Sequence, residues 1–263
     1  MLELRDVSRR VDGAAHLLGV SLSLARGSLN VLLGPTLAGK TSLMRIMAGL
    51  DRPSEGSVWF DGKDVTLTPV AKRNVAMVYQ QFINYPGWSV RDNIASPLKV
   101  KRTPKAKIKE EVARVASLLR LERCLDRKPL ELSGGQQQRV AMARALVKRA
   151  DLVLLDEPLA NLDYKLREEL RTELPKLFAD SKSVVVYATT DPTEALLLGG
   201  ATATMSEGRI TQIGPTLEVY RRPHDLITDR TFPDPPPNKV GAESEGAAHA
   251  PAVDATLALP KAM

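Results

Sequence analysis

Residues 34–41 constrain the fold of this chain more than any other feature of its sequence. They read GPTLAGKT and match the pattern G-x-x-x-x-G-K-[ST], whose glycines let backbone N–H groups close around phosphate oxygens. A predicted strand at 28–33, which ends in an apolar run, precedes the loop, and apolar residues at helical spacing over 41–49 follow it. The order of strand, glycine loop and helix N-terminus predicts a phosphate-binding site in an α/β fold.

Two side chains of this loop carry the chemistry that a bound polyphosphate needs. Lys40 provides a cation that can reach the β and γ phosphates, and the Thr41 hydroxyl can ligate Mg²⁺. A glycine-rich turn with an incidental lysine is the competing interpretation, and the flanking strand and helix disfavour it. The predicted phosphate-binding residues are Gly34, Pro35, Thr36, Leu37, Ala38, Gly39, Lys40 and Thr41.

A run of four apolar residues at 152–155 ends in the two carboxylates of Asp156 and Glu157. Such a run is typical of a strand that is buried on both faces of a parallel sheet, and ligands bind at the C-terminal ends of these strands. Asp156 is therefore placed to hold Mg²⁺, and Glu157 is placed to polarise an attacking water. Alone the pattern is weak, because strands often end in solvated carboxylates. Together with the phosphate loop it predicts a site for a nucleotide and Mg²⁺.

The rest of the chain fits an α/β fold with a mostly parallel sheet. Strand patterns at 152–155 and 183–188 alternate with helical patterns at 164–179 and 192–198. The 263 residues are 43% hydrophobic, which is enough apolar material for one large domain. A lone cysteine, Cys124, gives no disulfide framework, and neither a signal peptide nor an apolar membrane span is found, so a cytoplasmic location is the default expectation.

The charge of the chain is concentrated in residues 99–149. This segment holds 15 Lys/Arg and 5 Asp/Glu, a net charge of +10, whereas the chain as a whole carries +6 and the remainder therefore −4. Apolar residues at helical spacing predict amphipathic helices, whose charged face is either solvated or turned toward anionic lipid headgroups. A nucleic-acid partner is the alternative, but the segment contains no aromatic residue on which a base could stack.

Between the two nucleotide motifs, residues 132–136 read LSGGQ, and here the chain resembles the ATP-binding-cassette (ABC) family. A serine hydroxyl and glycine amides at the start of a helix can cap a γ-phosphate. In that family this signature loop serves the nucleotide of the opposite subunit, so the resemblance implies a head-to-tail dimer with two ATP molecules between the subunits. The implied residues are Ser133, Gly134, Gly135 and Gln136.

Further segments match the family residue by residue. Gln80 resembles the glutamine of the Q-loop, which implies a place near Mg²⁺ and the attacking water. Residues 81–86 resemble the segment that faces a membrane subunit in sugar importers, and residues 158–163 resemble the D-loop, which crosses the dimer interface. The resemblance covers about residues 1–238 and is closest to ATPase subunits of carbohydrate importers, above all those of bacterial glycerol and glycerol-phosphate importers.

This resemblance implies the α/β fold of P-loop NTPases, with a mostly parallel core sheet, an N-terminal antiparallel β-subdomain and an inserted α-helical subdomain at about 86–145. The ATPase domain is expected to occupy residues 1–230. Residues 231–263 are rich in proline and are expected to form a disordered tail, so that the regulatory β-domain of carbohydrate importers is essentially absent.

Three departures from the family pattern fall on one half of the nucleotide site. Thr190 stands where the family places a histidine, so a neutral hydroxyl replaces the imidazole. Val11 stands where an aromatic residue usually stacks on adenine, and no aromatic residue precedes Trp59, although His16 could substitute. Leu37 replaces a glycine of the phosphate loop. The residues implied for catalysis are Glu157, Gln80 and Thr190, and those implied for Mg²⁺ are Thr41, Gln80 and Asp156.

The resemblance implies an ATP-hydrolysing importer subunit for a small polyol or sugar-type solute, with glycerol or glycerol phosphate favoured. The expected partners are two integral membrane permease subunits, a second ABC ATPase subunit and an extracytoplasmic solute-binding protein, with no nucleic acid. The expected location is peripheral, on the cytoplasmic face of the inner membrane. Because of Thr190, this chain is expected to provide the degenerate site of a heterodimer. A homodimer with two working sites, a regulatory nucleotide binder with little hydrolysis, and an ABC ATPase acting on nucleic acid remain alternatives.

Overall fold

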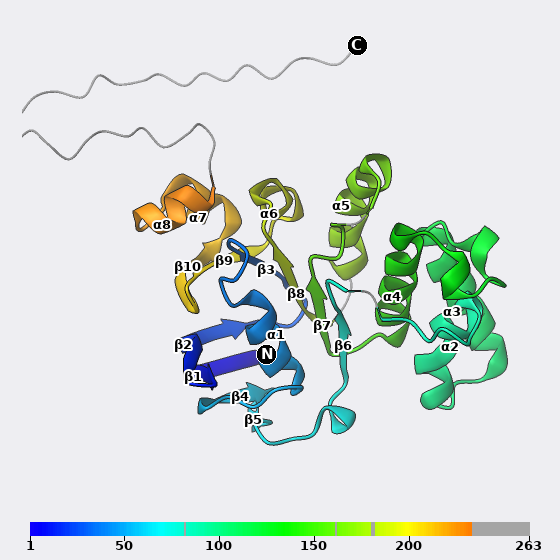
Figure 1. Cartoon of the computed structure of the whole chain (residues 1–263), viewed down its shortest axis with the longest axis horizontal. Helices are drawn as coiled ribbons and strands as arrows, with labels where there is room; N and C mark the ends of the chain where they lie inside the picture. Colours follow the sequence, from blue (N-terminus) through cyan, green and yellow to red (C-terminus); the bar gives the residue numbers. More distant parts are fainter. Residues whose placement is uncertain (82, 161, 180–181, 233–263) are drawn as a thin grey trace, which may run out of the picture.

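Two β-sheets organise the chain (Figure 1). The structure, a computed structural model, describes residues 1–81, 83–160, 162–179 and 182–232. The first sheet is antiparallel, in the order β2-β1-β4-β5. The second has the order β10-β9-β3-β8-β7-β6 and is parallel except for the pair of β9 and β10, which confirms the predicted mostly parallel core. The strands are β1 (Leu2–Val11), β2 (Ala14–Leu24), β3 (Leu29–Leu33), β4 (Glu55–Phe60), β5 (Lys63–Asp64), β6 (Val75–Val78), β7 (Leu152–Asp156), β8 (Val184–Thr189), β9 (Ala201–Ser206) and β10 (Arg209–Pro215).

Helices cover both faces of the parallel sheet. They are α1 (Lys40–Ala48), α2 (Val90–Val100), α3 (Lys105–Leu118), α4 (Gly134–Lys148), α5 (Tyr164–Ala179), α6 (Pro192–Leu198), α7 (Thr216–Arg221) and α8 (Leu226–Thr231), with short 3₁₀ turns at Val70–Lys72, Glu122–Cys124 and Pro129–Glu131. Among the described residues, no helix combines the length and the apolar character that a membrane crossing requires.

Strict alternation along the parallel strands builds two hydrophobic cores. In β7, Val153 and Leu155 join the core formed with α2 to α6, whereas Leu152 and Leu154 join the core formed with α1 and the antiparallel sheet. Every residue of β7 is buried, as the apolar run predicts. Each fully buried Leu or Val side chain stabilises the fold by about 1.5–3 kcal/mol, so these two cores fix where the polar ends of the strands lie.

The helices α2, α3 and α4 gather beside the edge of the parallel sheet (Figure 1). Ser89 begins α2 by accepting a hydrogen bond from the backbone N–H of Asp92 at 3.1 Å. Glu111 of α3 is buried and accepts hydrogen bonds from Arg114 at 3.0 Å and Arg149 at 2.7 Å, which joins α3 to the end of α4. Part of the positive charge of residues 99–149 is therefore neutralised within the fold.

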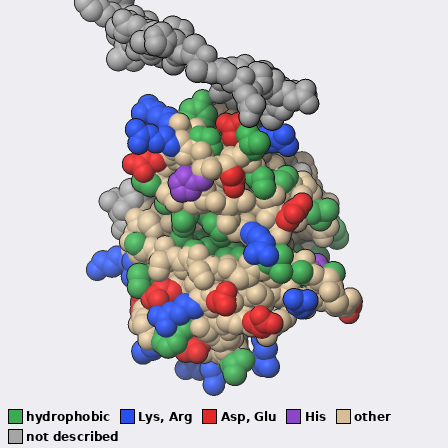
Figure 2. Space-filling model, turned by 90° about the vertical axis from the view of Figure 1, so that its left-hand side faces the viewer, with side chains coloured by type: hydrophobic (Ala, Val, Ile, Leu, Met, Phe, Trp, Pro, Cys, Tyr) green, Lys and Arg blue, Asp and Glu red, His purple; other side chains and the backbone are tan. Residues whose placement is uncertain are grey.

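The face opposite this helical cluster carries charges of both signs. Figure 2 shows Lys and Arg side chains interspersed with Asp and Glu, without a large surface of one sign. Residues 233–263 of the expected tail lie outside the described residues. Phe232, which the sequence assigned to that tail, is buried and packs against Tyr220 with ring centroids 5.6 Å apart, so it belongs to the folded part.

Candidate nucleotide-binding site

The phosphate loop connects the end of β3 to the start of α1 and encloses its own lysine. The Lys40 ammonium donates to the carbonyl oxygens of Gly34 at 2.6 Å and Pro35 at 2.9 Å, and the residue is only 5% exposed. Burial lowers the pKa of Lys40 from its ordinary value. Gly39 begins α1 with φ +101°, and a Cβ at Gly34 would lie 2.2 Å from the Met205 carbonyl oxygen, so both glycines are required by geometry.

Leu37 lies at the outer turn of the loop. Its φ of +68° is left-handed, and its side chain is 96% exposed. Glycine adopts this conformation freely, whereas a leucine pays about 1 kcal/mol or more in backbone strain. The leucine is therefore compatible with the loop path, but it places a large apolar side chain in solvent at the mouth of the site.

Thr41 and Asp156 bring the two nucleotide motifs together. The Thr41 hydroxyl donates to the Asp156 Oδ2 oxygen at 2.7 Å, across 115 residues of sequence. Asp156 ends β7 and is 2% exposed, and burial raises the pKa of its carboxyl although the Thr41 hydrogen bond and the Lys40 charge act in the opposite direction. A hydroxyl and a carboxylate side by side are the hard oxygen donors that Mg²⁺ takes together with phosphate oxygens. The described residues contain no cluster of three or more His, Cys, Asp or Glu that could hold a metal without such a ligand.

Glu157 follows directly, in a backbone conformation that turns its side chain away from the path of β7. Its φ is +46°, and its backbone N–H donates to the Ala188 carbonyl of the neighbouring strand at 3.0 Å. The carboxylate accepts a hydrogen bond from Gln80 Nε2 at 3.1 Å. Burial raises the pKa of Glu157, Lys40 opposes this, and Asp156 adds to it. A carboxylate with a raised pKa next to a phosphate site is suited to accept a proton from water.

Gln138 belongs to this site, although its position in the sequence gave no indication of it. Its Nε2 donates to the carbonyl oxygens of Pro158 at 2.7 Å and Glu157 at 3.3 Å, and the side chain is fully buried. Gln138 lies on α4, so it ties the helix behind the signature loop to the segment after β7. The run of three glutamines at 136–138 was the only signal, and it does not distinguish the buried one.

The signature residues cap α4 and lie at the surface. Ser133 Oγ accepts from the backbone N–H of Gln136 at 3.3 Å, and Gln136 Oε1 accepts from the backbone N–H of Ser133 at 3.0 Å. Ser133 and Gly134 are exposed. Within the described residues, no hydrogen bond or ion pair connects residues 133–136 to residues 34–41, so the structure does not bring the signature loop to this chain's own phosphate loop.

Thr190 lies close to the phosphate loop through its neighbour. The backbone N–H of Gly34 donates to the Thr189 carbonyl at 3.4 Å, and the Thr190 side chain is exposed. At the position expected for an adenine platform, Val11 is at the tip of the β1–β2 hairpin and is exposed, as is His16. Two further predicted positions, Phe82 and Asn161, lie outside the described residues.

The raised pKa of Glu157 predicts a pH-dependent gain of stability in Glu157→Gln. Ionised Glu157 is less stable in the folded chain than in the unfolded chain. It therefore lowers the free energy of unfolding at any pH where Glu157 is ionised in both states. This destabilisation disappears below the ordinary pKa of 4.5, where Glu157 is protonated in both the folded and the unfolded state. We expect Glu157→Gln to raise Tm at pH 7–8 and to lose this gain near pH 4, as measured by circular dichroism. The exposed Glu122→Gln is the control, and an equal Tm difference at every pH would contradict the prediction.

Comparison with known proteins finds the same family in a family model and in sequence relatives. The family model described as "ABC transporter" matches residues 17–160. The sn-glycerol-3-phosphate import ATP-binding protein UgpC 2 of Rhizobium johnstonii is 40% identical over 245 residues, covering 93% of this chain and 71% of the relative. The spermidine/putrescine import ATP-binding protein PotA of Spiroplasma citri is 42% identical over 234 residues, covering 89% of this chain and 67% of the relative.

A solved structure agrees with this context. The dimeric ATP-binding cassette MJ0796, in a post-hydrolysis state bound to ADP and Pi, aligns with a TM-score of 0.74 and 29% identity, over 82% of this chain and 99% of that one. Fold, motif positions and sequence relatives therefore all agree. The chain belongs to the ABC transporter family and is an ATPase cassette of that family.

Proposed function

We propose that this chain binds ATP with Mg²⁺ and hydrolyses it as the nucleotide-binding subunit of an importer. The single observation that supports the proposal is the convergence of two hydrogen-bonded pairs, Thr41 with Asp156 and Gln80 with Glu157. The first pair has the oxygen ligands that Mg²⁺ prefers, and Glu157 is the candidate base. Lys40, which contacts the same loop, supplies the cation for the phosphates.

Each residue of the site has a separate role in the proposed hydrolysis. The backbone N–H groups of residues 34–41 and the Lys40 ammonium hold the β and γ phosphates. Thr41 and Asp156 would hold Mg²⁺, which would supply positive charge at the γ-phosphate. Glu157 accepts a proton from water as the water oxygen bonds to the γ-phosphorus and the bond to the β–γ bridging oxygen breaks, which leaves ADP and phosphate. Gln80 donates to Glu157 and orients its carboxylate.

The signature loop suits a nucleotide held by another subunit. Ser133 and the glycine amides stand at the exposed N-terminus of the 15-residue helix α4, where a phosphate is favoured by the helix dipole. The homologous cassette MJ0796 is described as dimeric, which supports the same arrangement here. In this proposal, ATP binding closes the dimer and hydrolysis reopens it, and the closed and open states bias the membrane subunits toward different conformations.

Thr190 makes the two sites of such a dimer unequal if the partner has the family histidine. Thr190 cannot bridge the γ-phosphate as an imidazole does, so this chain's own site should turn over slowly while its signature loop completes the partner's site. A homodimer with two working sites is the alternative arrangement.

Single-turnover hydrolysis by the assembled importer separates these arrangements. We expect Glu157→Gln in this chain to lower the hydrolysis rate less than about threefold, and the same change in the partner ATPase to lower it about 100-fold or more, as loss of a general base does. Lys40→Ala in this chain should still remove ATP binding at its own site. Equal losses from the two Glu→Gln changes would rule out the unequal pair and leave the homodimer.

A groove beside the Q-loop suits the expected permease partner. It has a volume of about 770 Å³ and lies between residues 71–79 and the ends of α2 and α4. Ile83, Tyr85 and Trp88 line it and are all exposed, and the rings of Tyr85 and Trp88 lie 4.6 Å apart. Aromatic residues in a pocket are typical anchors of protein interfaces. A chain bound to a membrane subunit through this groove would be peripheral, on the cytoplasmic face of the membrane. The complete complex would also include an external solute-binding protein.

The groove yields a direct test of the permease contact. Trp88→Ala should weaken association with the permease subunits about tenfold or more, because an aromatic anchor is lost. ATP binding by the purified chain should be unchanged, since Trp88 lines the groove, whose described lining includes no residue of 34–41. Leu67→Ala, an exposed leucine outside the groove, is the matched control in the same co-purification assay. Undiminished recovery of the permease with Trp88→Ala would place the contact elsewhere.

The solute is proposed to be a small polyol or its phosphate. The relatives named for sn-glycerol-3-phosphate import support this, whereas the PotA relatives are named for spermidine and putrescine. A nucleic-acid substrate is disfavoured because residues 99–149, where the positive charge is concentrated, lack aromatic residues on which bases could stack.

A further inference from the structure

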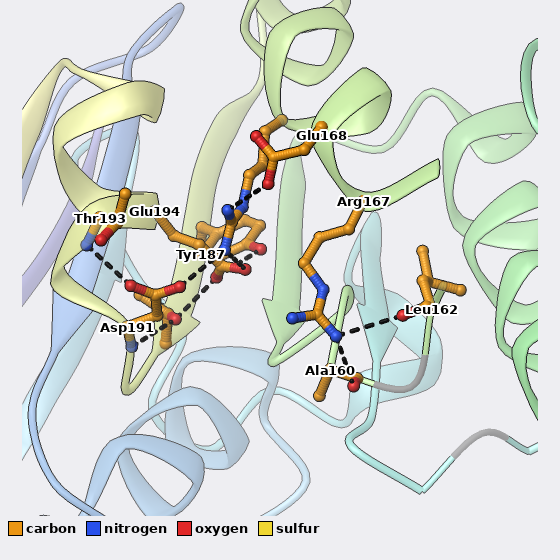
Figure 3. Close-up of polar contacts among 10 residues, drawn as sticks. Ala160, Leu162, Arg167, Glu168, Tyr187, Asp191, Thr193 and Glu194 are labelled. Atoms are coloured by element: carbon orange, nitrogen blue, oxygen red, sulfur yellow. Dashed lines mark hydrogen bonds and ion pairs between the residues drawn. The ribbon is translucent and has the colours of Figure 1, made fainter. Parts of the chain in front are cut away.

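Two arginines of α5, one helical turn apart, hold the two loops that flank Glu157. The first is Arg167, whose guanidinium donates to the carbonyl oxygens of Ala160 and Leu162, each at 3.2 Å. Figure 3 shows Arg167 pointing from α5 toward both residues. These carbonyls belong to the segment at 158–163 that follows Glu157, so Arg167 fixes the backbone path on one side of the candidate base.

The second arginine, Arg171, holds the loop after β8. Its Nη2 lies 2.6 Å from Asp191 Oδ2 and 3.2 Å from Glu194 Oε1, and its Nη1 lies 2.6 Å from Glu168 Oε1. Arg171 is 7% exposed. One guanidinium therefore contacts three carboxylates through two different nitrogens, a geometry that the planar fork of arginine allows and a lysine ammonium does not.

Glu194 extends this contact to Thr189. Its second carboxylate oxygen accepts from the Thr189 hydroxyl at 2.7 Å and from the Tyr187 hydroxyl at 2.9 Å, and Glu194 is buried. The Thr189 hydroxyl in turn accepts from the backbone N–H of Asp191 at 3.0 Å. Asp191 also caps α6 by accepting from the backbone N–H of Thr193 at 2.8 Å (Figure 3).

The backbone at Thr190 is therefore held in place by contacts of its two neighbours, Thr189 and Asp191. Thr189 is fixed through Glu194, Asp191 is fixed through Arg171, and the Thr189 carbonyl accepts from the phosphate-loop N–H of Gly34. The exposed side chain of Thr190 is thus presented from a backbone whose position depends on a buried network rooted in α5.

We infer that Arg171 is a positioning residue for hydrolysis, which fixes the loop that presents Thr190, and that Arg167 does the same for the segment after Glu157. Through these two residues α5 sets the positions of both loops around the γ-phosphate. The inference rests on the proposed ATPase function, because it assigns the network a part in turnover rather than in folding alone.

The variant Arg171→Lys separates positioning from folding. It keeps the positive charge among three carboxylates but cannot contact Glu168, Asp191 and Glu194 together. Removal of the charge, in contrast, would leave buried Glu194 uncompensated and could unfold the protein. Arg120→Lys is the matched control. Arg120 forms an ion pair with Glu169 of α5, and among the described residues it has no hydrogen bond or ion pair to either loop.

Hydrogen exchange on the full chain reads the position of the loop without any need for activity. Arg171→Lys should speed exchange at the Asp191 and Thr193 amides about tenfold or more, with α5 and the parallel sheet unchanged. Arg167→Lys should do the same at the Ala160 and Leu162 amides. Unchanged exchange in these loops, or a uniform increase throughout the fold with a matching fall in Tm, would overturn the inference.

Turnover is measured in the assembled importer whose partner ATPase carries the Glu→Gln change, so that hydrolysis comes from this chain. Arg171→Lys should lower the single-turnover rate about tenfold while the half-saturating ATP concentration changes less than about threefold. Thr190→Ala should lower the rate in the native background and less so with Arg171→Lys. Independent effects of the two substitutions, or no effect of Thr190→Ala, would overturn the inference.

Full hydrolysis by Lys40→Ala would instead refute the ATPase function, and hydrogen exchange would still decide the role of Arg171.

Discussion

The hydrogen bond from the Thr41 hydroxyl to the Asp156 carboxylate is the contact on which the nucleotide site depends. It joins the start of α1 to the end of β7, two segments that are 115 residues apart. Both ends are fixed by burial, because α1 packs between the two sheets and β7 is buried along its whole length. The two hydrophobic cores therefore place a hydroxyl, a carboxylate and a lysine within one small volume, where hard oxygen ligands and a cation suit a metal–phosphate complex.

Burial at this site has an energetic consequence that suits hydrolysis. The same desolvation that makes Lys40 harder to charge makes Asp156 and Glu157 harder to ionise, and each carboxylate raises the pKa of the lysine beside it. A polyphosphate and a divalent cation add charges of both signs to such a cluster and can relieve part of this cost. These buried charges therefore lower the stability of the ligand-free protein and favour the binding of ligands. Such a trade-off between stability and function is common at binding sites.

Local patterns in the sequence predicted the elements and the motif residues, because strand alternation, helical spacing and glycine loops are short-range signals. The strand before the phosphate loop, the buried β7 and the helices at 164–179 and 192–198 lie where their periodicity indicated. The supporting contacts could not be predicted this way. Gln138 reaches Pro158 across 20 residues and Arg171 reaches Glu194 across 23, and such distances are set by how helices pack on the sheet. The role of Ser133–Gln136 depends on a second subunit. The roles of these four residues and of Thr190 stay predictions.

The proposed function requires the phosphate loop of this chain to power solute import. ATP-dependent uptake of sn-glycerol 3-phosphate into vesicles that contain the assembled importer measures this, with Lys40→Ala compared with the native chain. Lys63→Ala, an exposed lysine of β5, is the control. We expect Lys40→Ala to abolish uptake and Lys63→Ala to leave it intact. Unchanged uptake with Lys40→Ala would refute a role of this phosphate loop in import.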